Sequence, residues 1–217
     1  WGWLVLVGHL ILFRTNIASR LASLRPLLDR GPADSRTTDP RDDPFRPAAP
    51  ADPTRLRGVR VFISTPTWTP NSINAWAGDM TRGLRDAGVD AALLLTEEDT
   101  PLVTIDQPRM ALPDDLPVER LVGTSPASWG GHWAALVRLL HDAAPCVYVI
   151  THDWRQSGVI PLLGRDVTVV QVAHAADALH LEQIGRLADA WDLVVAGSGT
   201  VSAALRQHVP TVEQRLV

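Results

Sequence analysis

The fold is decided by "RVFISTPTWTPNSINAWAGDMTRGLRDAGVDAALLLT", residues 60–96. Apolar runs at 59–64 and 90–96 predict two buried strands. Between them, residues 73–88 carry apolar side chains at spacings of three and four, which is typical of one face of a helix. We therefore expect a strand–loop–helix–strand unit, of the kind that opens a nucleotide-binding domain.

The loop of this unit, residues 64–74, contains no glycine. A phosphate-binding loop at this position is usually rich in glycine, because the backbone has to approach the phosphate closely. The sequence therefore raises the question of what the unit binds instead. Either Ser72 or Asn71 can cap the start of the helix, and Gly88 suits its end.

Strands and helices continue to alternate along the rest of the chain. Further strands are expected at 146–151, 167–173 and 192–198, with a short one near 118–122 in the irregular segment 97–125. Helices are expected at 132–143, 178–190 and 199–208, and a short helical stretch ends at 163. The last residues, 215–217, are typical of the start of another strand. The expected strands are apolar throughout, without alternation of apolar and polar residues, and helices separate them. This pattern predicts an α/β fold, a Rossmann-like parallel sheet with helices on both faces.

The N-terminal segment, residues 1–30, is expected to be helical and is apolar at first. Residues 1–13 are apolar except for His9, but a bilayer span needs ~20 residues. Arg14 and Arg20 follow, as they would on the cytoplasmic side of a membrane helix. Three interpretations stay open: a truncated span, an interfacial helix, or a helix that packs on a missing part. Association of residues 1–28 with the inner face of a membrane is therefore one of the alternatives.

Residues 31–57 have the composition of a disordered linker. They contain six prolines, several charged residues and, before Leu56, one large apolar side chain, Phe45. Such a stretch buries too little surface to offset the entropy of its chain. We expect the folded domain to occupy residues 58–217.

Charge and cysteine content exclude several classes of function. Residues 1–60 hold ten Arg and six acidic residues (+4), whereas residues 61–217 hold ten Arg and eighteen acidic residues (−8). The acidic main body argues against a nucleic-acid partner. Every basic residue is Arg, which excludes Schiff-base and P-loop lysine chemistry. The one cysteine, Cys146, lies in an apolar run and is expected to be a buried structural thiol, so we expect a reducing, cytoplasmic compartment.

Ligands of parallel α/β sheets bind beyond the carboxyl ends of the strands. Four stretches of this chain follow predicted strands and carry polar side chains there: residues 65–74, 151–158, 174–180 and 198–200.

These elements resemble the N-terminal domain of glycosyltransferase family 4, which has the GT-B fold. The resemblance covers residues 58–217. It rests on the unit at 60–96, "THDWRQSG" at 151–158, "VVQVAHAAD" at 169–177 and "ADAWDLVVAGSGTVSAAL" at 188–205, in that order. Many members of the family keep glycines in the first loop, so this loop is a departure from the family pattern.

The resemblance implies the acceptor-side domain of a retaining glycosyltransferase of the hexosyltransferase type. Such an enzyme moves a sugar from a nucleotide-sugar donor to a saccharide or lipid acceptor and needs no further cofactor. The nucleotide would lie mainly on a C-terminal donor domain, so the first loop of this domain need not cradle phosphate. We expect the chain to be cut off before that donor domain and to be inactive alone. The alternatives are a GT-B nucleotide-sugar epimerase and a non-catalytic Rossmann-like binding module.

The resemblance also suggests site residues. His174 matches a histidine of the family that ends a strand beside the donor sugar, and is the expected catalytic residue. The expected substrate-binding residues are Trp68, Asn71, Ser72, Asn74, His152, Asp153, Trp154, Asp177 and Ser198. The alternatives are that Trp68 packs beneath its loop, that Ser72, Asp153 and Asp177 cap helices, and that His174 is structural.

No metal site is expected. The sequence contains no Asp-x-Asp motif and lacks the family's pair of Glu residues separated by seven residues, which lies in the second domain. His174 and His180 are six positions apart, which is a poor spacing for sharing zinc.

Overall fold

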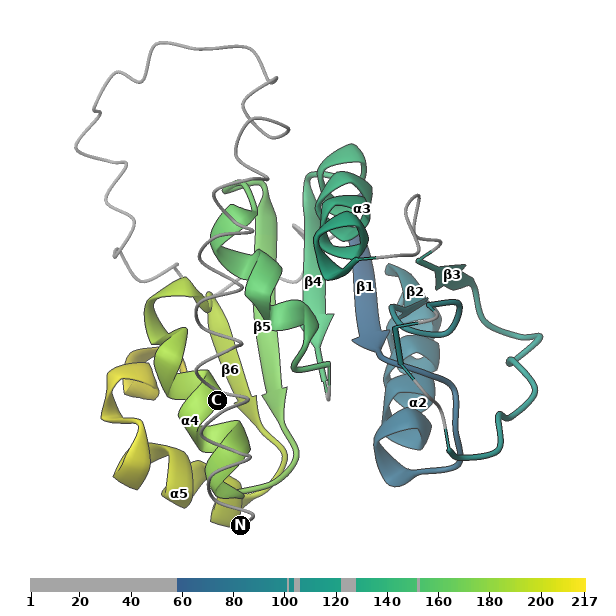
Figure 1. Cartoon of the computed structure of the whole chain (residues 1–217). Coiled ribbons are helices and arrows are strands. Elements are labelled where there is room, and N and C mark those ends of the chain that lie inside the picture. The colour runs from purple at the N-terminus through teal and green to yellow at the C-terminus, as the bar shows by residue number, and fades with distance from the viewer. Residues whose placement is uncertain (1–57, 101, 104–105, 122–127, 152) are drawn as a thin grey trace, which may run out of the picture. The chain divides into compact units, whose positions relative to one another are not determined.

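The computed structural model describes residues 58–217 except 101, 104–105, 122–127 and 152. The predictions for residues 1–30 and 31–57, and the proposed role of His152, lie outside the described residues. Within them, six strands form one sheet in which every neighbouring pair is parallel, in the order β3-β2-β1-β4-β5-β6 (Figure 1). The predicted Rossmann-like parallel α/β fold is confirmed.

The strands lie close to where the apolar runs predicted them. They are β1 (Arg60–Thr65), β2 (Asp90–Leu95), β3 (Val118–Arg120), β4 (Cys146–Ile150), β5 (Val167–Ala173) and β6 (Leu193–Ala196). Val194 and Leu216 form a parallel bridge, in keeping with the strand-like character of the last residues. The chain proceeds in one direction from β1 to β3 and then restarts at β4 on the other side of β1. The order of the strands therefore reverses between β1 and β4, which is where sheets of this type open a crevice for ligands.

The helices are α2 (Ser72–Asp86), α3 (Trp129–Asp142), α4 (Ala178–Arg186) and α5 (Gly199–His208). Shorter 3₁₀ segments are η3 (Gln156–Leu162), η4 (Ala188–Ala190) and η5 (Pro210–Arg215). No helix in the described part of the chain is long and apolar enough to span a membrane.

Two helix boundaries differ from the sequence expectation by three residues or more. Helix α3 begins at Trp129 rather than at residue 132, because Ser128 caps it and accepts a hydrogen bond from the backbone N–H of Gly131. The sequence pattern indicated a later start because the first turn contains two glycines, and glycine has a low helix propensity. The helix expected at 178–190 ends at Arg186. The indole N–H of Trp191 bonds to the carbonyl of Ile184 at 3.0 Å. In a longer helix, this carbonyl would accept from a backbone N–H of the next turn.

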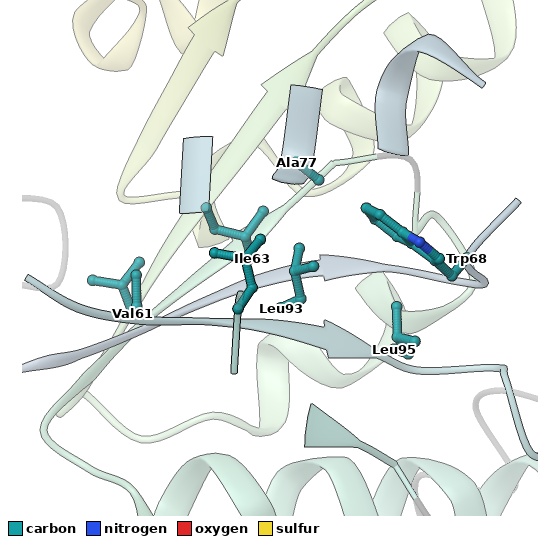
Figure 2. Packing of buried hydrophobic residues seen from close by; sticks show 8 residues of the cluster. Val61, Ile63, Trp68, Ala77, Leu93 and Leu95 are labelled. Atoms are coloured by element: carbon teal, nitrogen blue, oxygen red, sulfur yellow. The ribbon is translucent and has the colours of Figure 1, made fainter. Parts of the chain in front are cut away.

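The two faces of the sheet are covered by different helices. Val61 and Ile63 of β1 pack with Leu93 and Leu95 of β2 and with Ala77 of α2 in one buried cluster (Figure 2). The alternate residues of β1 and β4 point to the opposite face. There the thiol of Cys146 donates to the carbonyl of Leu140 of α3 at 3.4 Å.

Cys146 is buried, as predicted, and burial raises the pKa of its thiol to about 11. A thiol with so high a pKa carries almost no thiolate at neutral pH, so it is not a nucleophile there.

Candidate functional site

The loop after β1 is held in shape by one buried side chain, that of Asn74. Its amide group donates to the carbonyls of Thr67 and Thr69, both at 2.8 Å, and its oxygen accepts from the hydroxyl of Thr65 at 2.6 Å. Asn74 is 1% exposed, and its bonds to Thr65 and Thr69 are fully buried. Asn74 therefore gives the loop the fixed shape that a glycine-rich turn gives other sheets of this type.

Three positions of the same loop offer no free backbone donor. Pro66 and Pro70 have no N–H group. The N–H of Trp68 donates to a carboxylate oxygen of Glu98 at 3.0 Å. A phosphate cradle needs several backbone N–H groups that converge on one point. The loop therefore differs at these three positions, and in having no glycine, from the glycine-rich loops that cradle phosphate.

Trp68 lies in the hydrophobic core and is 7% exposed. Figure 2 shows it with Leu95 and Ala77 in the cluster beneath the loop. Its indole N–H donates to the carbonyl of Ala111 at 3.0 Å, and its ring packs so closely on α2 that a Cβ at Gly78 would lie 3.3 Å from it. The ring is thus packed under the loop, which is the alternative that the sequence left open, and its faces are not available to stack on a sugar.

Asn71, rather than Ser72, caps helix α2. Its side-chain oxygen accepts from the backbone N–H of Asn74 at 2.7 Å, and its amide group donates to the hydroxyl of Thr69 at 3.1 Å. Ser72 is the first residue of the helix and is exposed. Of these two side chains, only that of Asn71 lines the pocket beside the loop.

That pocket has a volume of about 310 Å³ and lies at the carboxyl end of β1. It is lined by Thr65, Pro66, Thr67, Thr69, Asn71, Ile73, Asn74 and Gln107. Gln107 is not among the predicted site residues, because it comes from the irregular segment that joins β2 to β3. Only the folded chain brings it beside the loop after β1.

The strand ends next to this loop are joined by a buried hydrogen bond. Thr96 follows β2, and its hydroxyl donates to the carboxyl of Asp153, which follows β4, at 2.5 Å. Asp153 is fully buried, and burial raises the pKa of its carboxyl from 3.8 to about 8. The carboxyl group is therefore mostly protonated at neutral pH. It joins two strand ends, and it is too deeply buried to contact a ligand.

A second link between the same two strand ends involves residues that the sequence analysis missed. Glu97 is 1% exposed, pairs with Arg155 at 2.7 Å and accepts from the amide of Gln156 at 3.2 Å. Burial raises the pKa of Glu97, and the positive charge of Arg155 opposes this shift. No local pattern reveals such a pair, because its members are 58 positions apart in the chain.

Trp154 is the exposed aromatic residue of this edge, with 40% of its surface accessible. The guanidinium of Arg155 lies 4.8 Å from the centre of its ring. The backbone carbonyl of Trp154 accepts from the amide of Gln183 of α4 at 2.6 Å, which ties the segment after β4 to that helix. Trp154 is thus positioned at the carboxyl edge, with part of its ring open to solvent.

His174 follows β5 and is half-buried at the carboxyl edge, as predicted. Its imidazole meets the indole of Trp76 edge to face, with the ring centres 4.9 Å apart. Trp76 belongs to α2, the helix whose first turn borders the pocket. His174 also adjoins Gly197, where a Cβ would lie 3.1 Å from the carbonyl oxygen of Ala173. Glycine at 197 therefore lets β5 and β6 end close together beside His174.

Asp177 and Ser198 are the N-caps of α4 and α5. Asp177 accepts from the backbone N–H groups of Leu179 and His180, both at 3.1 Å, and its carboxylate also bonds to the ring of His180. Ser198 accepts from the N–H of Val201 at 3.2 Å. For Asp177 this is the capping alternative that the sequence left open.

The structure divides the expected site residues into three groups. Asn71 and Asn74 line the pocket, and His174 is linked to the same helix through Trp76. Asp153 and Trp154 lie together after β4. Trp68 is in the core, Ser72 lies on the surface, and Asp177 and Ser198 cap helices. Within the described ranges, no three His, Cys, Asp or Glu side chains are grouped so that they could hold a metal ion.

Comparisons with known proteins do not add to this description. No model of a known protein family matches the chain, and a search of curated proteins finds no relative.

Proposed function

We propose that residues 58–217 form the N-terminal, acceptor-side domain of a retaining glycosyltransferase with the GT-B fold. The complete enzyme would move a sugar from a nucleotide-sugar donor to a saccharide or lipid acceptor. The proposal starts from the sequence resemblance to glycosyltransferase family 4 and from the confirmed class of fold.

The observation that carries the proposal is the chemistry of the loop after β1. In a sheet of this order, the crevice beside β1 is where a nucleotide phosphate would be expected. Here the loop has no glycine, and its two prolines and the Trp68 N–H, which is bonded to Glu98, offer no free donor. The loop instead borders a pocket of about 310 Å³ lined by hydroxyl and amide groups. A domain that receives an acceptor, with the nucleotide bound elsewhere, accounts for both features.

His174 supports the same proposal. Sugar transfer builds positive charge at the anomeric carbon and negative charge on the leaving phosphate. A neutral polar group held beside the sugar stabilises the distorted ring more than the relaxed one, so it lowers the barrier. His174 lies at the carboxyl end of β5, and Trp76 restricts the position of its ring.

The proposal is tested first by the reading frame that encodes this chain. A downstream α/β domain with two Glu residues separated by seven residues would support a transferase. A stop codon directly after Val217 would instead favour the non-catalytic binding module. The encoded protein, purified and incubated with nucleotide-sugars and saccharide acceptors, should then give a glycoside that retains the anomeric configuration of the donor. An isomerised nucleotide-sugar without transfer would favour the epimerase.

A further inference from the structure

The pocket after β1 has no charged side chain in its lining. Threonine, asparagine and glutamine supply its polar groups, and Pro66 and Ile73 supply apolar contacts. Its volume of about 310 Å³ is at the lower end of the range for small-molecule sites.

Only some of the polar groups are available to a ligand. The amide of Asn74 is fully used by its bonds to the loop. The hydroxyl of Thr69 accepts from Asn71, which leaves its own O–H free to donate. Among the described residues, neither the Thr67 hydroxyl nor the Gln107 amide has a hydrogen-bond partner. The available set thus contains both donors and acceptors, and all of them are neutral.

The buried carboxylate that bonds to the loop is already balanced. Glu98 accepts from the N–H of Trp68, and a carboxylate oxygen of Glu98 lies 3.2 Å from the guanidinium of Arg109. A bound phosphate or carboxylate would therefore lose its hydration and gain no cationic partner from the lining. A hydroxyl group loses less hydration, and it can both donate to and accept from the groups that line the pocket.

We infer that this pocket binds an uncharged polyhydroxylated ligand, a neutral sugar or cyclitol unit, through Thr67, Thr69, Asn71 and Gln107. The role of this ligand as the acceptor rests on the proposed function, but its chemistry follows from the pocket alone. The inference excludes acceptors whose phosphate or carboxylate group would enter the pocket.

The test is a titration of the isotope-labelled 217-residue chain, followed by amide NMR. The probes are glucose, mannose, galactose and myo-inositol, each paired with its monophosphate. We expect at least one neutral probe to shift the backbone resonances of Thr67 and Thr69 and the side-chain amides of Asn71 and Gln107. The affinity for its monophosphate should be lower by roughly tenfold or more. Equal or tighter binding of the phosphates, or no response to any neutral probe, would overturn the inference.

Two substitutions test whether the named groups make the contacts. Thr67→Val keeps the shape of the side chain and removes the hydroxyl, while the carbonyl that bonds to Asn74 remains. Gln107→Ala removes the exposed amide. Each should weaken binding of the neutral probe roughly fivefold, the effect of one lost hydrogen bond. The controls Thr168→Val on β5 and Gln207→Ala on α5 make the same replacements at exposed positions outside the pocket lining, and should bind as the wild type does.

Failure of this inference can be told apart from failure of the proposed function, because binding is measured without donor or transfer. If sugar is transferred to acceptors but the pocket resonances respond only to phosphates, the inference is wrong and the transferase proposal stands. If a neutral probe binds at Thr67 and Gln107 but the complete protein transfers no sugar, the inference stands and the transferase proposal falls.

Discussion

The hydroxyl of Thr96 donates a 2.5 Å hydrogen bond to the carboxyl of Asp153, although the two residues are 57 positions apart. Thr96 follows β2 and Asp153 follows β4, and β1 lies between these strands. The bond therefore passes across the carboxyl end of β1, next to the loop that borders the pocket. It fixes the two sides of this edge relative to each other.

The first prediction concerns the pH dependence of stability. Burial raises the pKa of Asp153 from 3.8 to about 8 in the folded protein. Between about pH 4 and 8 the unfolded chain has lost this proton and the folded chain retains it. This carboxyl alone should therefore make the free energy of unfolding fall by up to about 1.4 kcal/mol per pH unit as pH rises through that window.

Asp153→Asn removes this titration and keeps an acceptor for the Thr96 hydroxyl. Urea unfolding at pH 5 and pH 7.5 should show a shallower fall in stability for this variant than for the wild type, and a more stable variant at pH 7.5. Asp114→Asn, at an exposed position, controls for the loss of one negative charge. Equal slopes for the wild type and Asp153→Asn would show that the carboxyl is not held protonated.

The second prediction concerns the side chain that shapes the loop. Asn74→Ala removes three hydrogen bonds of a buried side chain and leaves the carbonyls of Thr67 and Thr69 without their donor. We expect a loss of roughly 3 kcal/mol in the free energy of unfolding, at about 1 kcal/mol for each bond. Asn71→Ala, which mainly removes a helix cap, should cost only about 1 kcal/mol. Similar losses for the two variants would contradict the central role of Asn74.

The third prediction compares two glycines of helix α2. At Gly83 a Cβ would meet no atom within 4 Å, whereas at Gly78 it would lie 3.3 Å from the ring of Trp68. Gly83→Ala should therefore stabilise the protein by about 0.5–1 kcal/mol through helix propensity alone. Gly78→Ala should be clearly less favourable, because Trp68 has to shift within the core. Equal gains in thermal unfolding would mean that Trp68 does not pack against α2 as described.

Much of the fold could be predicted from the sequence because it depends on local patterns. Unalternated apolar runs indicated the strands, and the spacing of Trp76 and Ala77 with later apolar residues indicated α2. Capping positions were harder to predict, since both Asn71 and Ser72 are good caps and only the folded geometry selects Asn71. The first turn of α3 was missed because its two glycines do not favour a helix.

The site could be predicted only in part, because its chemistry depends on contacts between distant segments. The rule that ligands bind at strand ends indicated the loop after β1 and the segments at Asp153 and His174. It could not show that Trp68 turns into the core, or that Glu97 pairs with Arg155 from 58 positions away. Gln107 gave no signal at all, since it comes from an irregular segment.

The central claim is tested most directly by the turnover number for sugar transfer in His174→Ala, measured in the complete protein that carries this domain. His208→Ala, at an exposed position that ends α5, is the matched control, because His180 is bonded to Asp177 and is less suitable. Loss of one positioned hydrogen bond at the transition state commonly costs roughly 10²-fold in rate. We predict such a fall in kcat for a folded His174→Ala protein with nearly unchanged donor binding, and near wild-type transfer by His208→Ala. Wild-type turnover by His174→Ala would contradict the placement of the sugar site at the end of β5.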